Sequence, residues 1–185
     1  MKVTCVVAVV VLVGIVALAQ TAPNQQTFNA NGVSFDYPSG WTIYDDSNAD
    51  AQQLTLGRPK NDVQIRVFVH KGRITPEKFP DAKKAFIDPY IASTVKQFVA
   101  MGAKPEQSAD SSEIAGLKAD GVKVTANLGA PGAAKIYWAL VGQHVVILTI
   151  FGPDDEIKQF TPAWDTVRSS LKVEDKAAPK PSPKP

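Results

Sequence analysis

Cysteine is nearly absent from this chain of 185 residues, which contains a single one, Cys5. That residue lies in an apolar N-terminal segment that we expect to be removed, so the mature protein would contain no cysteine. This absence excludes disulfides, thiolate metal sites and cysteine nucleophiles. An exported protein without disulfides depends on its hydrophobic core, which favours a bacterial periplasm or exterior over a small animal secreted module.

The chain also lacks an excess of charge of either sign. Its 20 lysine and arginine residues nearly balance 18 aspartate and glutamate residues, so no basic face for nucleic acid is indicated. Histidine is scarce as well. Neither His70 nor His144 has another histidine or a carboxylate at the spacing of zinc ligands. We interpret both as residues at strand ends beside turns and predict no metal site.

The motifs of common catalytic sites are missing. No Gly-x-Ser-x-Gly turn is present, and the loop from Gly129 to Gly132 lacks the lysine of a phosphate-binding loop. The segment from Asp45 to Asp50 is rich in oxygen ligands but lacks the glycine and glutamate of a calcium loop, which favours a solvated loop. The sequence therefore predicts no enzyme, no cofactor and no catalytic residue.

The N-terminus has the pattern of an export signal. Lys2 precedes an apolar run from Val6 to Leu18, which closes on small residues at Ala17 and Ala19. This arrangement predicts a signal peptide over residues 1–19 that is cut after Ala19. The run is shorter than the roughly 20 residues that a membrane span needs, so no span is expected after cleavage. We expect the protein in the periplasm or outside the cell.

The remaining chain divides into a linker over 20–26, one domain over 27–175 and a tail over 176–185. The tail alternates proline with other residues, a pattern that forbids helix and ladder pairing. Two interpretations stay open: an extended solvated end, or a basic tether to an anionic polymer of the cell envelope. The lysines that such a tether would use are Lys176, Lys180 and Lys184.

Alternating apolar residues predict most of the strands. Asn31-Gly32 joins two such runs and is the strongest short hairpin signal in the chain. The run from Val145 to Phe151 is apolar on both faces, so we expect it to lie centrally in a sheet that is covered on both sides. The predicted strands cover 27–29, 33–37, 41–44, 53–58 and 62–70, and a second block of strands covers 107–151.

Helical patterns lie between and after these blocks. Residues 79–87 have apolar residues at helical spacing, and Asp88-Pro89 is predicted either to cap a new helix or to kink a single one. Gly102 is predicted to end this helix, and Thr161-Pro162 to cap the last one. The order predicts an α+β fold with a mostly antiparallel sheet and helices packed on it. The central helix is expected to carry an apolar stripe at helical spacing, formed by Ile91, Val95, Phe98 and Val99.

One segment resembles a known signature. The run Val33-Ser34-Phe35-Asp36-Tyr37-Pro38-Ser39-Gly40-Trp41 is similar to the N-terminal motif of PsbP-like proteins, an apolar strand that leads into Tyr-Pro-x-Gly-Trp. The resemblance covers most of residues 27–173 and implies the Mog1/PsbP-like fold, an antiparallel sheet sandwiched between helices. The motif itself is expected to be structural. Its residues are Tyr37, Pro38, Gly40 and Trp41.

The resemblance and the missing catalytic motifs together predict an exported, non-enzymatic accessory or binding domain with a protein or envelope partner. One alternative is a carrier of a small molecule or lipid, which needs an apolar cleft above about 300 Å³ between sheet and helix. Another is a hydrolase with a carboxylate pair of raised pKa in a cleft. About four of the five aromatic residues that could line a pocket are expected in the core. They are Trp41, Tyr44, Tyr137, Trp138 and Trp164.

Overall fold

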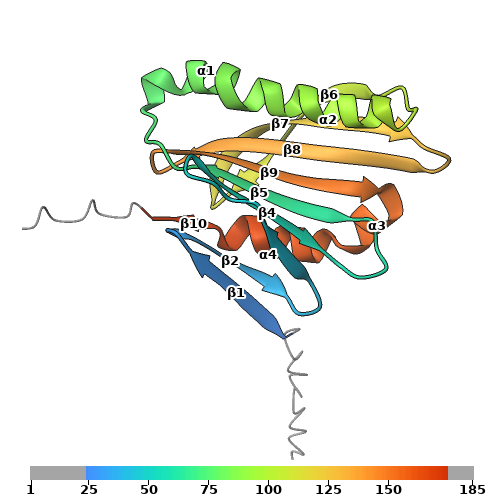
Figure 1. The fold of residues 1–185 in the computed structure, drawn as a ribbon, viewed down its shortest axis with the longest axis horizontal. Helices are drawn as coiled ribbons and strands as arrows, with labels where there is room; N and C mark the ends of the chain where they lie inside the picture. The colour runs from blue at the N-terminus through green and yellow to red at the C-terminus, as the bar shows by residue number, and fades with distance from the viewer. Residues whose placement is uncertain (1–23, 175–185) are drawn as a thin grey trace, which may run out of the picture.

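The structure is a computed structural model, and it describes residues 24–174 (Figure 1). The predicted signal peptide, most of the predicted linker and the predicted tail lie outside these residues. The strands in the described range are β1 (Gln25–Ala30), β2 (Val33–Pro38), β3 (Thr42–Asp45), β4 (Ala51–Gly57), β5 (Gln64–His70), β6 (Glu106–Ile114), β7 (Leu117–Asn127), β8 (Pro131–Val141), β9 (His144–Pro153) and β10 (Lys172–Val173).

Seven of these strands form one antiparallel sheet in the order β3-β4-β5-β9-β8-β7-β6. β9 is the middle strand, and every residue from His144 to Ile150 is buried. This confirms that the strand with two apolar faces lies centrally between two layers. The strands β6 and β3 are the two edges of the sheet.

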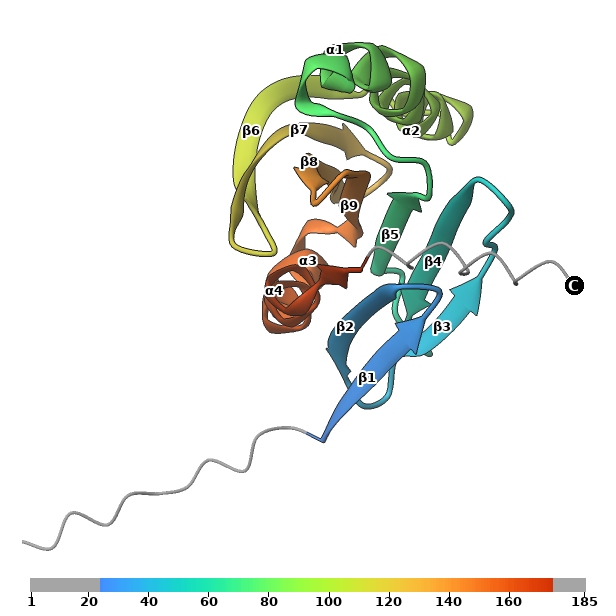
Figure 2. The same ribbon diagram turned by 90° about the vertical axis from the view of Figure 1, so that its left-hand side faces the viewer.

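A smaller sheet has the order β1-β2-β10. Figure 2 shows its hairpin next to the last helix. Asn31 and Gly32 form the turn with φ angles of 54° and 81°, as a two-residue type I′ hairpin requires. β1 begins at Gln25 rather than at the predicted Thr27, which shortens the linker by two residues.

One helical run crosses the first face of the large sheet. It consists of η1 (Pro76–Lys78), α1 (Phe79–Ala82), η2 (Lys83–Ile87) and α2 (Asp88–Ala100), of which η2 is a π-helical turn. Of the two alternatives for Asp88-Pro89, the helix cap is wrong, because the φ and ψ of Asp88, −61° and −42°, are helical and its carboxylate pairs with Lys83. The helical run instead continues through Pro89. Pro89 lacks an N–H and would crowd the preceding turn, and the wider π turn before it makes room for its ring.

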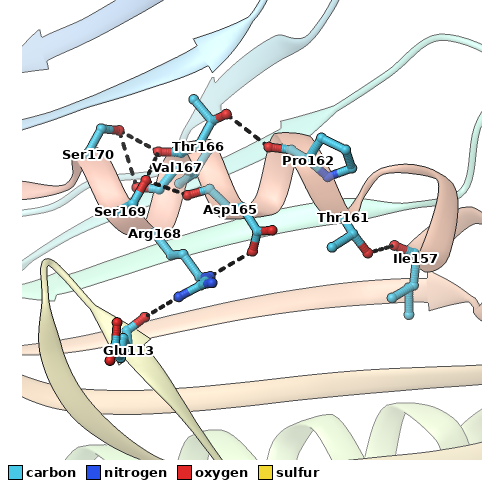
Figure 3. A network of polar contacts seen from close by, with 10 residues as sticks. All are labelled: Glu113, Ile157, Thr161, Pro162, Asp165, Thr166, Val167, Arg168, Ser169 and Ser170. Carbon is cyan, nitrogen blue, oxygen red and sulfur yellow. Dashed lines mark hydrogen bonds and ion pairs between the residues drawn. The ribbon is translucent and has the colours of Figure 1, made fainter.

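Two short helices cover the opposite face, α3 (Asp154–Gln159) and α4 (Thr161–Ser170). The prediction of Thr161 as the cap is wrong. Phe160 occupies that position, and the hydroxyl of Thr161 instead donates to the carbonyl oxygen of Ile157 at 2.9 Å (Figure 3). Arg168 joins α4 to β6 by donating to the Asp165 carboxylate at 2.8 Å and to the Glu113 carbonyl at 3.2 Å (Figure 3).

The large sheet separates two apolar cores. One core lies between the sheet, α4 and the small sheet and includes Phe35, Leu56 and Trp164. The other lies between the sheet and α2 and includes Phe98 and Trp138. The predicted α+β fold, with an antiparallel sheet between helices, is therefore confirmed. None of the helices within residues 24–174 is both long and apolar enough to cross a bilayer.

Candidate binding surface at the end of α2

An apolar groove of about 430 Å³ opens at the C-terminal end of α2. Its walls come from that helix end, from the loop between β7 and β8, and from neighbouring ends of β5 and β9. The volume exceeds the roughly 300 Å³ at which small-molecule pockets begin. The apolar side chains around it are Phe98, Met101, Leu128, Pro131 and Phe151.

Large apolar side chains are unusually exposed around this groove. Met101 and Leu128, which both line it, are 49% and 44% exposed, and Val99 of α2 is 55% exposed. The apolar stripe predicted for the central helix is therefore exposed at Val99, and Leu128, one residue after the end of β7, is exposed as well. Single exposed apolar residues are ordinary, but a cluster beside a groove marks an interaction surface.

Two turns place these side chains. Gly102 has a φ of 88°, which ends the helix directly after Met101. Leu128 stands in a tight loop, where the N–H of Leu128 donates to the carbonyl of Ala130 at 3.1 Å and the N–H of Gly129 donates to the Asn127 carboxamide at 3.0 Å. Since both turns are closed by local hydrogen bonds or by a glycine, the groove is formed by the fold without any ligand.

The floor of the groove is fixed by aromatic packing. The rings of Phe98 and Phe151 lie with their centroids 5.3 Å apart. The guanidinium of Arg66 also lies over the Phe151 ring, 5.4 Å from its centroid, and donates to the Gln64 carboxamide oxygen at 2.9 Å. The groove thus has an apolar floor, and the polar side chains that line it, Asp62 and Gln64, lie at or just before the start of β5.

A second cavity, of about 320 Å³, lies between the small sheet and the ends of β5 and β9. Lys71 and Arg73 bring positive charge to it, and Glu174 brings negative charge. These mixed charges favour neither an anion nor a cation, so this cavity does not indicate a class of ligand.

The two histidines lie together near this second cavity, because β5 and β9 are neighbours in the sheet. The Nδ1 atom of His144 is 3.0 Å from the carbonyl oxygen of His70, and the His70 ring packs on Phe86 with centroids 4.3 Å apart. Both are at strand ends, as predicted. Across residues 24–174, no group of three or more histidine, cysteine or carboxylate side chains could hold a metal ion.

The oxygen-rich loop after β3 uses its oxygens for local hydrogen bonds. The Asp45 carboxylate accepts the Ser47 N–H at 2.9 Å, and the Asn48 carboxamide accepts the N–H groups of Asp50 and Ala51, each at 2.9 Å. Hydrogen bonds from Ser47 lower the pKa of Asp45. This shift keeps the carboxylate ionised and is opposite to the raised pKa that a general acid needs.

The family motif lies away from the groove, at the small sheet and the turn that follows it. Gly40 has a φ of 84°, as its tight turn requires. Trp41 is buried and meets Phe160 edge-on with the ring centroids 5.5 Å apart. Tyr37 is half-buried, 6.2 Å from the Phe35 ring, and Pro38 ends β2. These positions are compatible with a structural role.

The five aromatic side chains that could have lined a pocket are mostly in the core. Tyr44 alone is exposed, and the remaining four are buried. Tyr137 and Trp164 pack together with ring centroids 5.9 Å apart, while Trp138 lies under the helical run with the Lys83 ammonium 5.5 Å from its centroid. None of the five lines the groove, so sequence reasoning missed the residues that do.

Solved structures share the fold of this chain. No protein-family model matches the chain, and no curated protein matches it at a significant level. Cyanobacterial PsbP (CyanoP) from Synechocystis sp. PCC 6803 superposes with a TM-score of 0.51 at 16% identity, over 81% of this chain and 92% of that one. A protein of Bacteroides thetaiotaomicron gives a TM-score of 0.52 at 15% identity, over 84% of this chain and half of that one. Residues 24–174 therefore have the PsbP-like fold that the sequence motif implied.

Proposed function

We propose that this chain is an exported, non-enzymatic accessory domain that binds a partner protein through the groove at the end of α2. The observation that carries the proposal is the cluster of exposed apolar side chains around that groove. Burial of Met101 and Leu128 by a partner would remove apolar surface from water, at about 25 cal/mol per Å². An apolar or aromatic side chain of the partner, seated on Phe98 and Phe151, would act as the anchor.

Export is supported by the N-terminal sequence pattern. The apolar run and the small residues at Ala17 and Ala19 favour cleavage by a signal peptidase. We therefore place the binding reaction in the periplasm or outside the cell. The protein purified without residues 1–19 is the form in which binding should be measured.

A carrier of a small apolar molecule or lipid is the second candidate function. The groove volume of about 430 Å³ favours it, because ligand pockets occupy about 300 to 1,000 Å³. The two functions differ in what binds the isolated protein. A carrier takes up a fluorescent fatty acid without any partner, whereas a docking surface for a protein does so weakly or not at all.

The test compares two aspartate substitutions at equally exposed leucines. Leu128 and Leu117 are each 44% exposed, but only Leu128 lines the groove. Leu128→Asp should weaken recovery of the partner from envelope extracts by at least about tenfold, and Leu117→Asp should leave it unchanged. Near-ultraviolet circular dichroism checks that both variants remain folded.

The proposal requires that recovery of the partner depend on the side chains of the groove. A protein recovered by the wild type and by Leu117→Asp, and lost with Leu128→Asp, supports the proposal. If both variants recover the same proteins in the same amounts, the groove is not the binding surface. Saturable uptake of the fatty acid that Leu128→Asp abolishes would favour the carrier instead.

A further inference from the structure

We propose that the edge strand β6, together with the neighbouring face of α2, binds an extended peptide in which apolar and basic side chains alternate. The peptide adds to the large sheet as an eighth strand. This site shares no lining residue with the groove at the end of α2, so the two can succeed or fail separately.

A shallow apolar groove runs between α2 and β6. It has a volume of about 510 Å³ and is lined by one face of the helix and by Gln107 of the strand. Figure 2 shows β6 as the outermost strand of the large sheet, with one end beside the helical run and the other near α4. The helix residues that line this groove are Asp88, Ile91, Ala92, Val95 and Lys96.

The hairpin geometry shows which backbone groups of β6 point outward. Ala115 and Gly116 have φ angles of 53° and 74°, so they form a two-residue type I′ turn closed by Ile114 and Leu117. The closing pair exchanges hydrogen bonds within the hairpin, and the pattern alternates along an antiparallel pair. The N–H and C=O groups of Gln107 and Ala109 therefore point away from β7.

The same alternation explains two bonds at the other end of the strand. Arg168 donates to the outward carbonyl of Glu113 at 3.2 Å, and the outward N–H of Ser111 donates to the Asp110 carboxylate at 2.8 Å. The half of β6 near α4 is thus partly closed by its own side chains. The half near α2 is open, and it is the half that borders the apolar groove.

β6 also lacks three of the features that protect an edge strand, which are proline, lysine and a bulge. Its nine residues contain no proline and no lysine, and its pairing with β7 runs without a bulge from Glu106 to Ile114. Such an edge is a template for strand addition. Recognition of this kind takes its affinity from backbone hydrogen bonds and its specificity from alternate side chains.

The register between β6 and β7 predicts which types of side chain the added strand should carry on each of its two faces. Gln107 and Ala109 lie opposite Val124 and Val122, which face the core beneath α2. Residues of the peptide on this side would meet the apolar groove and should be apolar. Glu106 and Asp110 lie on the other face of β6, where directly opposed side chains are about 5 Å apart. The Asp110 carboxylate already accepts bonds from the Ser111 N–H and the Tyr137 hydroxyl, so Glu106 is the exposed acidic side chain on this face. Residues of the peptide on that side should therefore be basic.

Charge also argues against a second copy of this chain as the occupant. Antiparallel pairing of two β6 strands centred on Ser108 would oppose Glu106 of one copy to Asp110 of the other, twice over. Like charges directly opposite each other destabilise a strand pair. The geometry therefore favours a different chain with basic residues.

The test uses a capped hexapeptide that alternates lysine and valine, added to the protein without residues 1–19. Amide chemical shifts should change from Glu106 to Asp110 and along the α2 face. Ala109→Pro removes one outward N–H without a bond to β7, so it should weaken binding about tenfold. Ser111→Pro is the matched control, because the Ser111 N–H already donates to the Asp110 carboxylate. This variant should change the peptide affinity by no more than about twofold, whereas a tenfold loss corresponds to about 1.4 kcal/mol.

A second variant tests the helix side. Ala92 is exposed in the groove, so Ala92→Glu keeps a good helix former while it places a charge where the peptide's apolar residues lie, and binding should weaken. The proposal is overturned if the peptide does not bind at millimolar concentration, if a glutamate-valine hexapeptide binds as tightly, or if Ala109→Pro and Ser111→Pro have equal effects. Sedimentation should show a monomer, and a dimer lost with Ala109→Pro would overturn the assignment of the occupant.

Discussion

Gly121 of β7 is a position where a single added methyl group should be costly. The Tyr137 side chain of β8 crosses over this glycine, and its hydroxyl donates to the Asp110 carboxylate of β6 at 2.7 Å. A Cβ at Gly121 would lie 2.3 Å from Cδ1 of Tyr137 and 2.8 Å from the carbonyl oxygen of Ile136. The second atom belongs to the backbone of the central sheet, so relaxation is restricted.

The size of the effect follows from three contributions. Overpacking costs about 1–3 kcal/mol, and loss of the hydrogen bond to a charged partner costs about 1.5–3 kcal/mol. Replacement of a strand glycine by alanine returns about 0.5–1 kcal/mol. Gly121→Ala should therefore lower the free energy of unfolding by about 3 kcal/mol, which for a domain of this size lowers Tm by about 6–12 °C.

Urea unfolding followed by tryptophan fluorescence measures this change. Gly57→Ala in β4 is the matched control, because its Cβ would meet only Cε2 of Tyr44 at an ordinary 3.7 Å. That variant should be neutral or slightly stabilised. The cost at Gly121 should also shrink when Tyr137 is replaced by leucine, since the ring that causes the clash is then gone. Equal stability of Gly121→Ala and Gly57→Ala would refute the reasoning.

Three more predictions concern buried or strained groups. Gln52 is fully buried and neither atom of its carboxamide has a protein hydrogen-bond partner. Gln52→Leu should therefore raise the free energy of unfolding by about 1–3 kcal/mol. A loss of stability in urea unfolding, or an equal gain with the control Gln53→Leu on the opposite face, would contradict this. Ala115 has a φ of 53°, so Ala115→Gly should raise the unfolding free energy by about 1 kcal/mol, whereas the strand control Ala30→Gly should lower it. Burial, and then the hydrogen bond and charge of Asp110, raise the pKa of Tyr137 well above its ordinary 10.0. Above pH 10 the unfolded chain loses this proton while the folded chain keeps it, so stability should fall as pH rises; the fall is at most about 1.4 kcal/mol per pH unit and should be absent in Tyr137→Phe.

Much of the fold could be predicted because local signals and tertiary structure agree. Asn31-Gly32 set a type I′ turn, and the register of β1 and β2 follows from it. The run from Val145 to Phe151 could only be covered on both faces, and β9 is indeed the central strand. In each case, the alternation of side chains along the strand or the stereochemistry of the turn allows only one low-energy structure.

The failures lie where a tertiary contact decides between two local options. Thr161 has the side chain of a helix cap, but α3 ends directly before it and offers a free carbonyl at Ile157. Asp88 before a proline has the pattern of a new helix start, but Lys83 pairs with its carboxylate and a π turn carries the helix through. Neither partner is visible in the local pattern, because each depends on the helix already present before it.

The groove at the end of α2 could not be predicted for a different reason. Its walls come from four segments whose residues are up to about ninety positions apart in the chain, from Asp62 to Pro153. Leu128, which lines the groove, continues the apolar alternation of β7, and Val99 beside the groove continues the apolar stripe of α2. Burial is the correct average expectation for such residues. Leu128 is exposed because it follows the end of β7 at Asn127, in a loop that turns at Gly129, whereas Val99 is exposed within the last turn of α2. A residue that keeps the pattern of the core after its element has ended is thus a sequence signal for a binding surface, and the aspartate substitution at Leu128 tests that signal directly.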